Sequence, residues 1–258
     1  MYKLTRPDGY DFYSGTINYR EAIGTIIRVT DYDPPEKGSC GRGLHASKNP
    51  NNCFVGTRIP CAAFRVRGIQ LIAKDSYKTR YQALKVVEEI TNLDTLFGWK
   101  YSEAINPIHP FKIVPPEINE GHIELIKQWA SVWDSVRASV WDSVRDTVWA
   151  SVRDSVWASV GDSVWASVWA SVGASVGASV WDSVWASVRA SVRAYTGSLF
   201  PNIKKWEYIN HKKGEYPLQP VVDLWKQGLV PSFDGKTWRL HGKEDAEILL
   251  EISSGSLV

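Results

Sequence analysis

The glycine-rich stretch GSCGRGLHASKNP holds the residues best suited to chemistry in this chain. Gly41 and Gly43 allow close approach of the backbone to another group, and His45 follows on a short strand-like run. Two structures fit this pattern. One is a tight turn with a structural histidine. The other is a small pocket lined by the backbone amides of residues 41–43 and by His45, and we take it as the candidate ligand site.

This turn is loosely similar to the NAD-binding turn of ADP-ribosyltransferases, in which a G-x-G lies beside a strand. The resemblance implies an NAD-using transferase with a pocket near Gly43 and His45, and Glu88 or Glu89 would have to serve as its catalytic acid. The series of Arg or His, Ser-Thr-Ser and Glu that such enzymes carry does not follow here. The transferase therefore stands as the alternative function, and we assign no catalytic residue and no cofactor.

The cysteines add little to this candidate site. Cys40, Cys53 and Cys61 are odd in number and form no C-x-x-C pair, so we expect buried free thiols in a reducing cytoplasm. Together with His45 they match no zinc-binding spacing, and we expect no metal site.

The overall composition is that of a globular protein that neither crosses a membrane nor carries a strong charge. The 258 residues are 44% hydrophobic and 22% charged, with a formal net charge of +2. Such a small charge argues against a global attraction to nucleic acid or to acidic membranes. We see no secretory signal at the start and no apolar run of about 18 residues, so we expect a cytoplasmic protein.

A four-residue repeat dominates the centre of the chain. From Trp129 to Thr196 the sequence divides into 17 units of x-[Ala/Asp]-Ser-Val, where x is Trp nine times, Arg five times and Gly three times. Single-base codon changes relate these alternatives, so we infer that the array grew by duplication of a short DNA unit. Each unit buries its apolar side only against its neighbours, as in other repeat arrays.

A helical array is the structure that we favour. Four residues turn a helix by about 400°, so Val and the following x residue form one apolar stripe, and Ala/Asp and Ser form the other side. Gly161, Gly173 and Gly177 are the expected breaks between shorter helices. A β-solenoid with four residues per side is the alternative, because Val and Trp favour strands.

The flanks of the array also favour a helix. Upstream, Asn119 is a candidate N-cap and Ile123, Ile126 and Trp129 follow at helical spacing. Downstream, Gly197 precedes a proline by a few residues and is typical of a helix end.

The Trp and Arg columns of the array are the candidate interface with a protein partner, because both residue types are enriched at interface hot spots. Five Arg against six Asp leave the array with a net charge of −1, which argues against binding to nucleic acid. We expect contact with a protein, for example one of the host, and self-association is a second form of contact. The interface candidates are Trp133, Trp141, Trp149, Trp157, Trp165, Arg137, Arg145 and Arg153.

We therefore predict an α+β protein in four segments. Residues 1–92 form a small α+β domain with strands at 24–32, 43–47 and 61–73 and a helix at 77–90. Residues 93–118 form a Pro-rich connector, and residues 119–197 form the array. Residues 198–258 form a capping module with a helix at 220–227, a hairpin with a type I′ turn at Asp234–Gly235 and a strand at 246–252.

The combination of GRGLHASKNP, the tetrapeptide array and the tail DLWKQGLVPSFDGKTWRLH resembles a family of uncharacterised phage and prophage proteins over nearly the whole chain. The resemblance implies a phage context inside a bacterial host cell and adds weight to a helical array. It implies no activity. We accordingly expect a non-enzymatic, phage-associated binding or structural protein.

Overall fold

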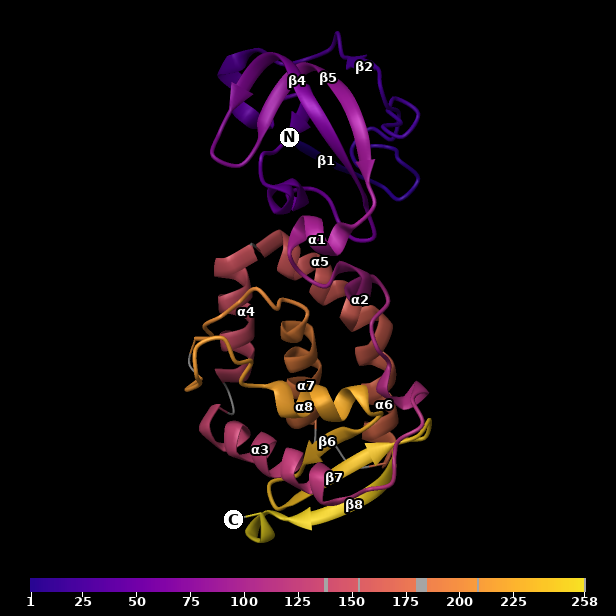
Figure 1. The fold of residues 1–258 in the computed structure, drawn as a ribbon, viewed down its shortest axis with the longest axis vertical. Coiled ribbons are helices and arrows are strands. Elements are labelled where there is room, and N and C mark those ends of the chain that lie inside the picture. Colours follow the sequence, from indigo (N-terminus) through magenta and orange to yellow (C-terminus); the bar gives the residue numbers. More distant parts are fainter. Residues whose placement is uncertain (137–138, 153, 180–184, 208, 258) are drawn as a thin grey trace. The chain divides into compact units, whose positions relative to one another are not determined.

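The computed structural model is a mixed α+β fold with antiparallel sheets (Figure 1). It describes residues 1–136, 139–152, 154–179, 185–207 and 209–257. The chain divides into two compact units. Unit 1 comprises Met1–Gly98 and Val152–Ser159, and unit 2 comprises Trp99–Ser151 and Val160–Val258.

Unit 1 is built on one antiparallel sheet in which β1, β4, β5 and β2 lie side by side and β3 pairs with β5. Its core includes Phe64 and Val66 of β4 and Leu84 and Val86 of β5, all fully buried. The strands are β1 (Tyr2–Thr5), β2 (Ile26–Arg28), β3 (Leu44–Ala46), β4 (Ala62–Lys74) and β5 (Thr79–Ile90).

The helix predicted at residues 77–90 is wrong, because this segment is strand β5. Its pairing with β4 runs from Ala63 opposite Ile90 to Lys74 opposite Thr79. The spacing of Tyr81 and Leu84 suits a helix as well as a strand, but β4 supplies a long partner with which this segment can pair. Backbone pairing across the sheet thus overrides a local helical pattern.

Short helices accompany the sheet and also occupy the segment predicted as a Pro-rich connector. In unit 1 these are η1 (Pro35–Cys40), η2 (Pro50–Phe54) and α1 (Leu93–Phe97). In unit 2 they are α2 (Tyr101–Ile105) and η3 (Pro110–Lys112).

The tetrapeptide segment is helical wherever the structure describes it. Asn119 accepts a hydrogen bond from Gly121 N at 2.9 Å, as an N-cap does, just before the first helix begins. Gly161 and Gly173 lie inside helices, as does Gly177, so the predicted breaks at glycine are wrong. The helices are α3 (Glu120–Val136), α4 (Ser139–Val152), α5 (Asp154–Val164), the π-helical turn η4 (Trp165–Trp169), α6 (Ala170–Ser179) and α7 (Trp185–Ser198).

Most of the described valines of the array are buried. Each of ten valines exposes at most 3% of its surface: Val144, Val148, Val156, Val160, Val164, Val168, Val172, Val176, Val188 and Val192. Burial of apolar surface contributes about 25 cal/mol per Å², so these valines stabilise the helices.

The Ser column carries a second role, which the sequence did not predict. Its hydroxyls bind backbone groups of segments outside the array. Thr147 Oγ1 accepts from Glu207 N at 3.0 Å, and Ser187 Oγ accepts from Phe233 N at 2.8 Å. The expectation that the Ser column faces away from the packed side is therefore wrong for these two residues, both of which are buried.

The C-terminal segment of unit 2 ends in a three-stranded antiparallel sheet, β6-β7-β8. The hairpin is confirmed, but its turn is not type I′, since Gly235 has a positive φ of 100° and Asp234 does not. Asp234 Oδ1 instead accepts from the amides of Lys236 and Thr237, each at 2.8 Å. The elements are α8 (Gln219–Lys226), which packs on both α3 and α7, and β6 (Val230–Phe233), β7 (Thr237–Gly242), β8 (Glu247–Ser253) and η6 (Ser254–Ser256).

In the part of the chain that the structure describes, no helix combines the length and the apolar character that crossing a membrane requires.

Candidate functional site

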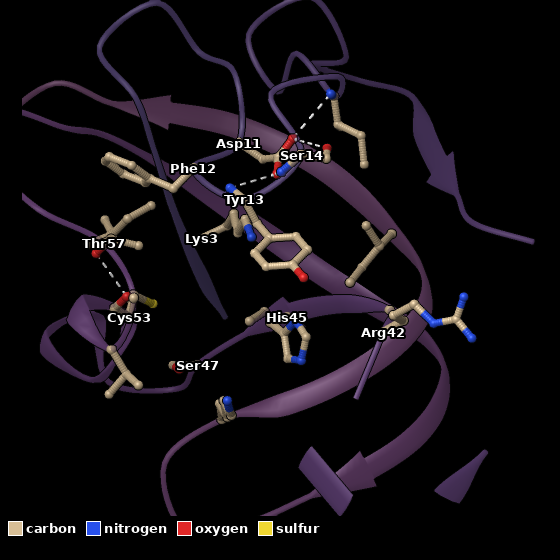
Figure 2. Close-up of a pocket in the computed structure, with 18 of the residues that line it drawn as sticks. Lys3, Asp11, Phe12, Tyr13, Ser14, Arg42, His45, Ser47, Cys53 and Thr57 are labelled. Carbon is tan, nitrogen blue, oxygen red and sulfur yellow. Dashed lines mark hydrogen bonds between the residues drawn. The ribbon is translucent and has the colours of Figure 1, made fainter. Parts of the chain in front are cut away.

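A cavity of about 520 Å³ lies in unit 1. Strands β1 and β3 contribute to its wall, together with the loops at residues 11–17, 40–43 and 52–57. Gly41, Gly43 and His45 are all among its lining residues, and Figure 2 shows His45 with other residues that line the cavity. The structure therefore brings the three residues of the predicted pocket to one cavity.

The two glycines make room for the buried side chain of Arg80, on strand β5. A Cβ atom on Gly43 would lie 2.9 Å from Arg80 Cγ, and one on Gly41 would collide with the Arg80 guanidinium. Gly43 also has a φ of 142°, which disfavours any other residue. The G-x-G pattern is thus explained by packing against Arg80, not by contact with a ligand.

Arg80 fixes the loop that leads into the cavity. Its guanidinium donates to the carbonyl oxygens of Asp33 at 2.7 Å, Pro34 at 2.8 Å and Arg42 at 2.8 Å. Arginine is suited to this task because its fork of donors meets several acceptors at once. The sequence does not single out Arg80, because the apolar spacing of residues 77–90 predicts a helix in place of strand β5.

His45 enters the cavity as a neutral imidazole. Its Nε2 lies 2.9 Å from the carbonyl oxygen of Ser39, which can only accept, so we assign the proton to Nε2. Burial lowers the pKa of His45 to about 4, with a further contribution from the Lys3 ammonium. The other ring nitrogen, Nδ1, is therefore a hydrogen-bond acceptor, and within the described residues nothing donates to it.

Lys3 on strand β1 lines the same cavity. Burial lowers its pKa, and Asp11 only partly offsets that effect. Its Nζ lies 5.5 Å from the centre of the Tyr19 ring. Among the residues that the structure describes, Lys3 Nζ has neither a hydrogen-bond acceptor nor an ion-pair partner.

Asp11 is a buried carboxylate whose oxygens are already occupied. Oδ1 accepts from Ser14 Oγ at 2.7 Å and from Ile17 N at 3.2 Å, and Oδ2 accepts from Tyr13 N at 3.1 Å and Ser14 N at 2.7 Å. Burial opposes ionisation, but the hydrogen bonds from Ser14 and Ile17 outweigh it and hold the pKa of Asp11 below its usual range. The hydrogen bonds of Asp11 therefore stabilise the loop to which it belongs. Figure 2 shows the Tyr13 ring extending from this turn.

Cys40, at the edge of the cavity, is exposed, in contrast to the expected buried thiol. A hydrogen bond with Lys78 lowers the pKa of its thiol. Cys53 also lines the cavity, and burial raises the pKa of its thiol. Within the described ranges, no group of three or more His, Cys, Asp or Glu side chains is placed to hold a metal ion.

The two glutamates that a transferase would need lie elsewhere on strand β5. Glu88 Oε1 pairs with Arg65 at 2.6 Å, and Glu89 Oε1 pairs with Arg20 at 2.6 Å. Neither is among the residues that line the cavity.

The predicted interface residues of the array have different environments. Trp133 is buried, with its ring centre 6.0 Å from that of Trp129. Trp157 is half-buried, and Arg145 pairs with Asp146 at 2.8 Å. Arg137 and Arg153 lie outside the described residues, as do the side chains of Trp141 and Trp149.

Trp165 is the predicted interface residue with the greatest described exposure, at 46%. It begins the π-helical turn η4, and its ring centre lies 4.8 Å from that of the buried Trp169. Arg189 on helix α7 is exposed, with its Cζ 5.6 Å from the centre of the Trp169 ring. We call Trp165, Trp169 and Arg189 the aromatic patch.

Sequence reasoning missed Lys3, Asp11 and Tyr19 as lining residues. The spacing Asp11-x-x-Ser14 is typical of a side-chain-capped turn and could have indicated an ordered loop. Nothing local indicated that Lys3 would face a cavity, because the fold places it there.

The comparisons with known proteins give no relative of this chain: no protein-family model, no curated protein and no solved structure matches it.

Proposed function

We propose that the protein is a non-enzymatic, phage-associated binding protein that contacts a protein partner through the aromatic patch on its tetrapeptide helices. The phage context rests on the resemblance of the sequence. The binding function rests on one observation above all, the exposure of Trp165 beside Trp169 and Arg189.

The physical argument for the patch is the cost of leaving it uncovered. A tryptophan exposed by 46% presents a large apolar surface to water, whereas the valines of the same helices are buried. Covering that surface contributes about 25 cal/mol per Å² to association. Arg189 at the edge adds a charge that suits a carboxylate on the partner.

The π-helical turn supports the same proposal. An ideal α-helix is the default for this repeat, and a π-helical turn occurs rarely, frequently at functional sites. It stands here at Trp165–Trp169, the sequence WASVW. The turn therefore coincides with the exposed tryptophan.

The transferase alternative receives less support from the geometry. Glu88 and Glu89 are engaged by arginines away from the cavity, and the oxygens of Asp11 are occupied by its own loop. Incubation with labelled NAD and host lysate separates the two functions. We expect no transfer of label, and transfer that His45→Ala abolishes would favour the enzyme.

Site-specific photo-crosslinking tests the binding function. A benzophenone amino acid replaces Trp165 in the full chain, inside phage-infected cells, and in a control chain it replaces Tyr32, which is 39% exposed in unit 1. We expect one discrete adduct with another protein from position 165 only, and its loss when Arg189→Glu is added. An adduct with a second copy of the chain alone, or equal labelling from position 32, would contradict the proposal.

A further inference from the structure

We infer that the cavity of unit 1 binds a small organic anion that also carries a hydroxyl or amino group. Lys3 meets the anionic group, and Nδ1 of His45 accepts a hydrogen bond from the hydroxyl or amine. This site is separate from the aromatic patch and does not depend on the proposed function.

The Lys3 ammonium needs a counter-charge that the described chain does not provide. Lys3 is half-buried, and removing part of its hydration shell without supplying a partner destabilises the ammonium. The oxygens of Asp11, the carboxylate that interacts with Lys3 electrostatically, accept four hydrogen bonds from Tyr13, Ser14 and Ile17. The lowered pKa of Lys3 agrees with this lack of compensation.

Two further polar groups of the cavity wall can bind a ligand. The carbonyl of Ser39 fixes the proton of His45 on Nε2, so Nδ1 presents a lone pair. Tyr19 lines the cavity, and its hydroxyl is buried without a hydrogen-bond partner. Buried polar groups are normally hydrogen-bonded, so the unpaired Tyr19 hydroxyl beside Lys3 and His45 points to a ligand at this cavity.

The charges that face the cavity favour an anion. Arg42 forms ion pairs with Asp31 at 2.6 Å and Asp33 at 2.9 Å, and Figure 2 shows its guanidinium directed away from His45. The residues that line the cavity include three cations, Lys3, Arg42 and Lys78, and two carboxylates, Asp11 and Asp31, so the lining carries a net charge of +1.

The size of the cavity sets the class of ligand. About 520 Å³ lies within the range of small-molecule sites, roughly 300–1,000 Å³. The anionic group is a carboxylate or a phosphate, and both chemistries suit Lys3.

Calorimetric titration of the full chain at pH 7 tests the ligand class. The probes are glycerate, glycerol 3-phosphate and glycerol, which share hydroxyls and differ in charge. We expect at least one anion to bind with a Kd below about 1 mM, and glycerol to bind at least tenfold more weakly. The tighter anion identifies a carboxylate or a phosphate. Binding of neither anion at about 10 mM, or equal binding of glycerol, would overturn the inference.

A lysine substitution tests the site itself. Lys3→Met removes the half-buried charge, and Lys85→Met removes an exposed lysine of β5 that does not line the cavity. We expect Lys3→Met to weaken anion binding at least tenfold and to raise the melting midpoint of the ligand-free protein by about 2–4 °C, because an uncompensated charge is lost. Lys85→Met leaves both properties unchanged. Undiminished binding in Lys3→Met, or a lowered melting midpoint, would show that Lys3 is not a ligand-binding residue.

Discussion

At the scale of single residues, burial gives identical side chains different chemistry. Cys40 is exposed and bound by Lys78, whereas Cys53 is half-buried beside the Tyr2 carbonyl oxygen at 3.3 Å. The same contrast separates Asp11, held as a carboxylate by hydrogen bonds, from Lys3, whose charge lacks such support. Local surroundings therefore decide which groups of the cavity can react or bind.

The thiols provide the first prediction. Because Lys78 lowers the pKa of Cys40 and burial raises that of Cys53, we expect iodoacetamide to alkylate Cys40 first. Peptide mass spectrometry at several reaction times measures the two rates, and Cys40→Ser provides the control. Faster labelling of Cys53 in the native protein would contradict this description of the cavity edge.

His45 provides the second prediction, a loss of stability in acid. An unfolded histidine takes up a proton near pH 6.5, whereas folded His45 stays neutral down to about pH 4. The unfolded state thus binds more protons between these values, so stability is full above pH 6.5 and falls as the pH decreases toward 4. The loss is at most about 3 kcal/mol, at 1.36 kcal/mol per pKa unit.

Hydrogen exchange of the β5 amides, which pair with β3, measures this loss within unit 1. The difference in protection between the wild type and His45→Gln should decrease as the pH falls from 7 to 4. A difference that stays constant over this range would show that His45 does not carry the effect.

At the scale of elements, each position of the tetrapeptide has a different structural role. Val fills the buried column, and Ser or Thr hydroxyls reach across to neighbouring backbone, as Thr147 does to Glu207. The first position varies most, from the buried Trp133 to the exposed Trp165. The variable position is therefore the one through which the array can change its surface without changing its core.

The third prediction compares two positions of helix α4. Val148→Asp places an unpaired charge in the buried column and should cost about 3–5 kcal/mol of stability. Ala150→Asp changes an exposed position at which other units already carry Asp, and should stay within about 0.5 kcal/mol. Thermal melts followed by circular dichroism at 222 nm compare the two, and equal destabilisation would refute a Val core.

The elements also show which parts of the fold can be predicted from the sequence. The N-cap at Asn119 and strand β4 were predictable, because capping and β-branched runs act over a few residues. Strand β5 was not, since its apolar spacing fits two structures and its partner decides between them. The cavity was predicted only at Gly41, Gly43 and His45, because the other residues reach it through the fold.

At the scale of the whole molecule, the two units offer two kinds of surface. Unit 1 holds a partly open cavity lined by polar and apolar side chains, and unit 2 presents the aromatic patch, in which Trp165 is exposed, on helices with a valine core. A small ligand suits the first and a protein suits the second.

The central claim is that Trp165 is a hot spot for a protein partner, and the affinity of that complex is its most direct test. Isothermal titration compares the partner identified by crosslinking with the wild type, with Trp165→Ser and with the control Tyr32→Ser. A hot spot is worth at least about 2 kcal/mol, so Trp165→Ser should weaken binding roughly 30-fold, and Tyr32→Ser should leave it within about twofold. An affinity of Trp165→Ser within about twofold of the wild type would contradict the claim.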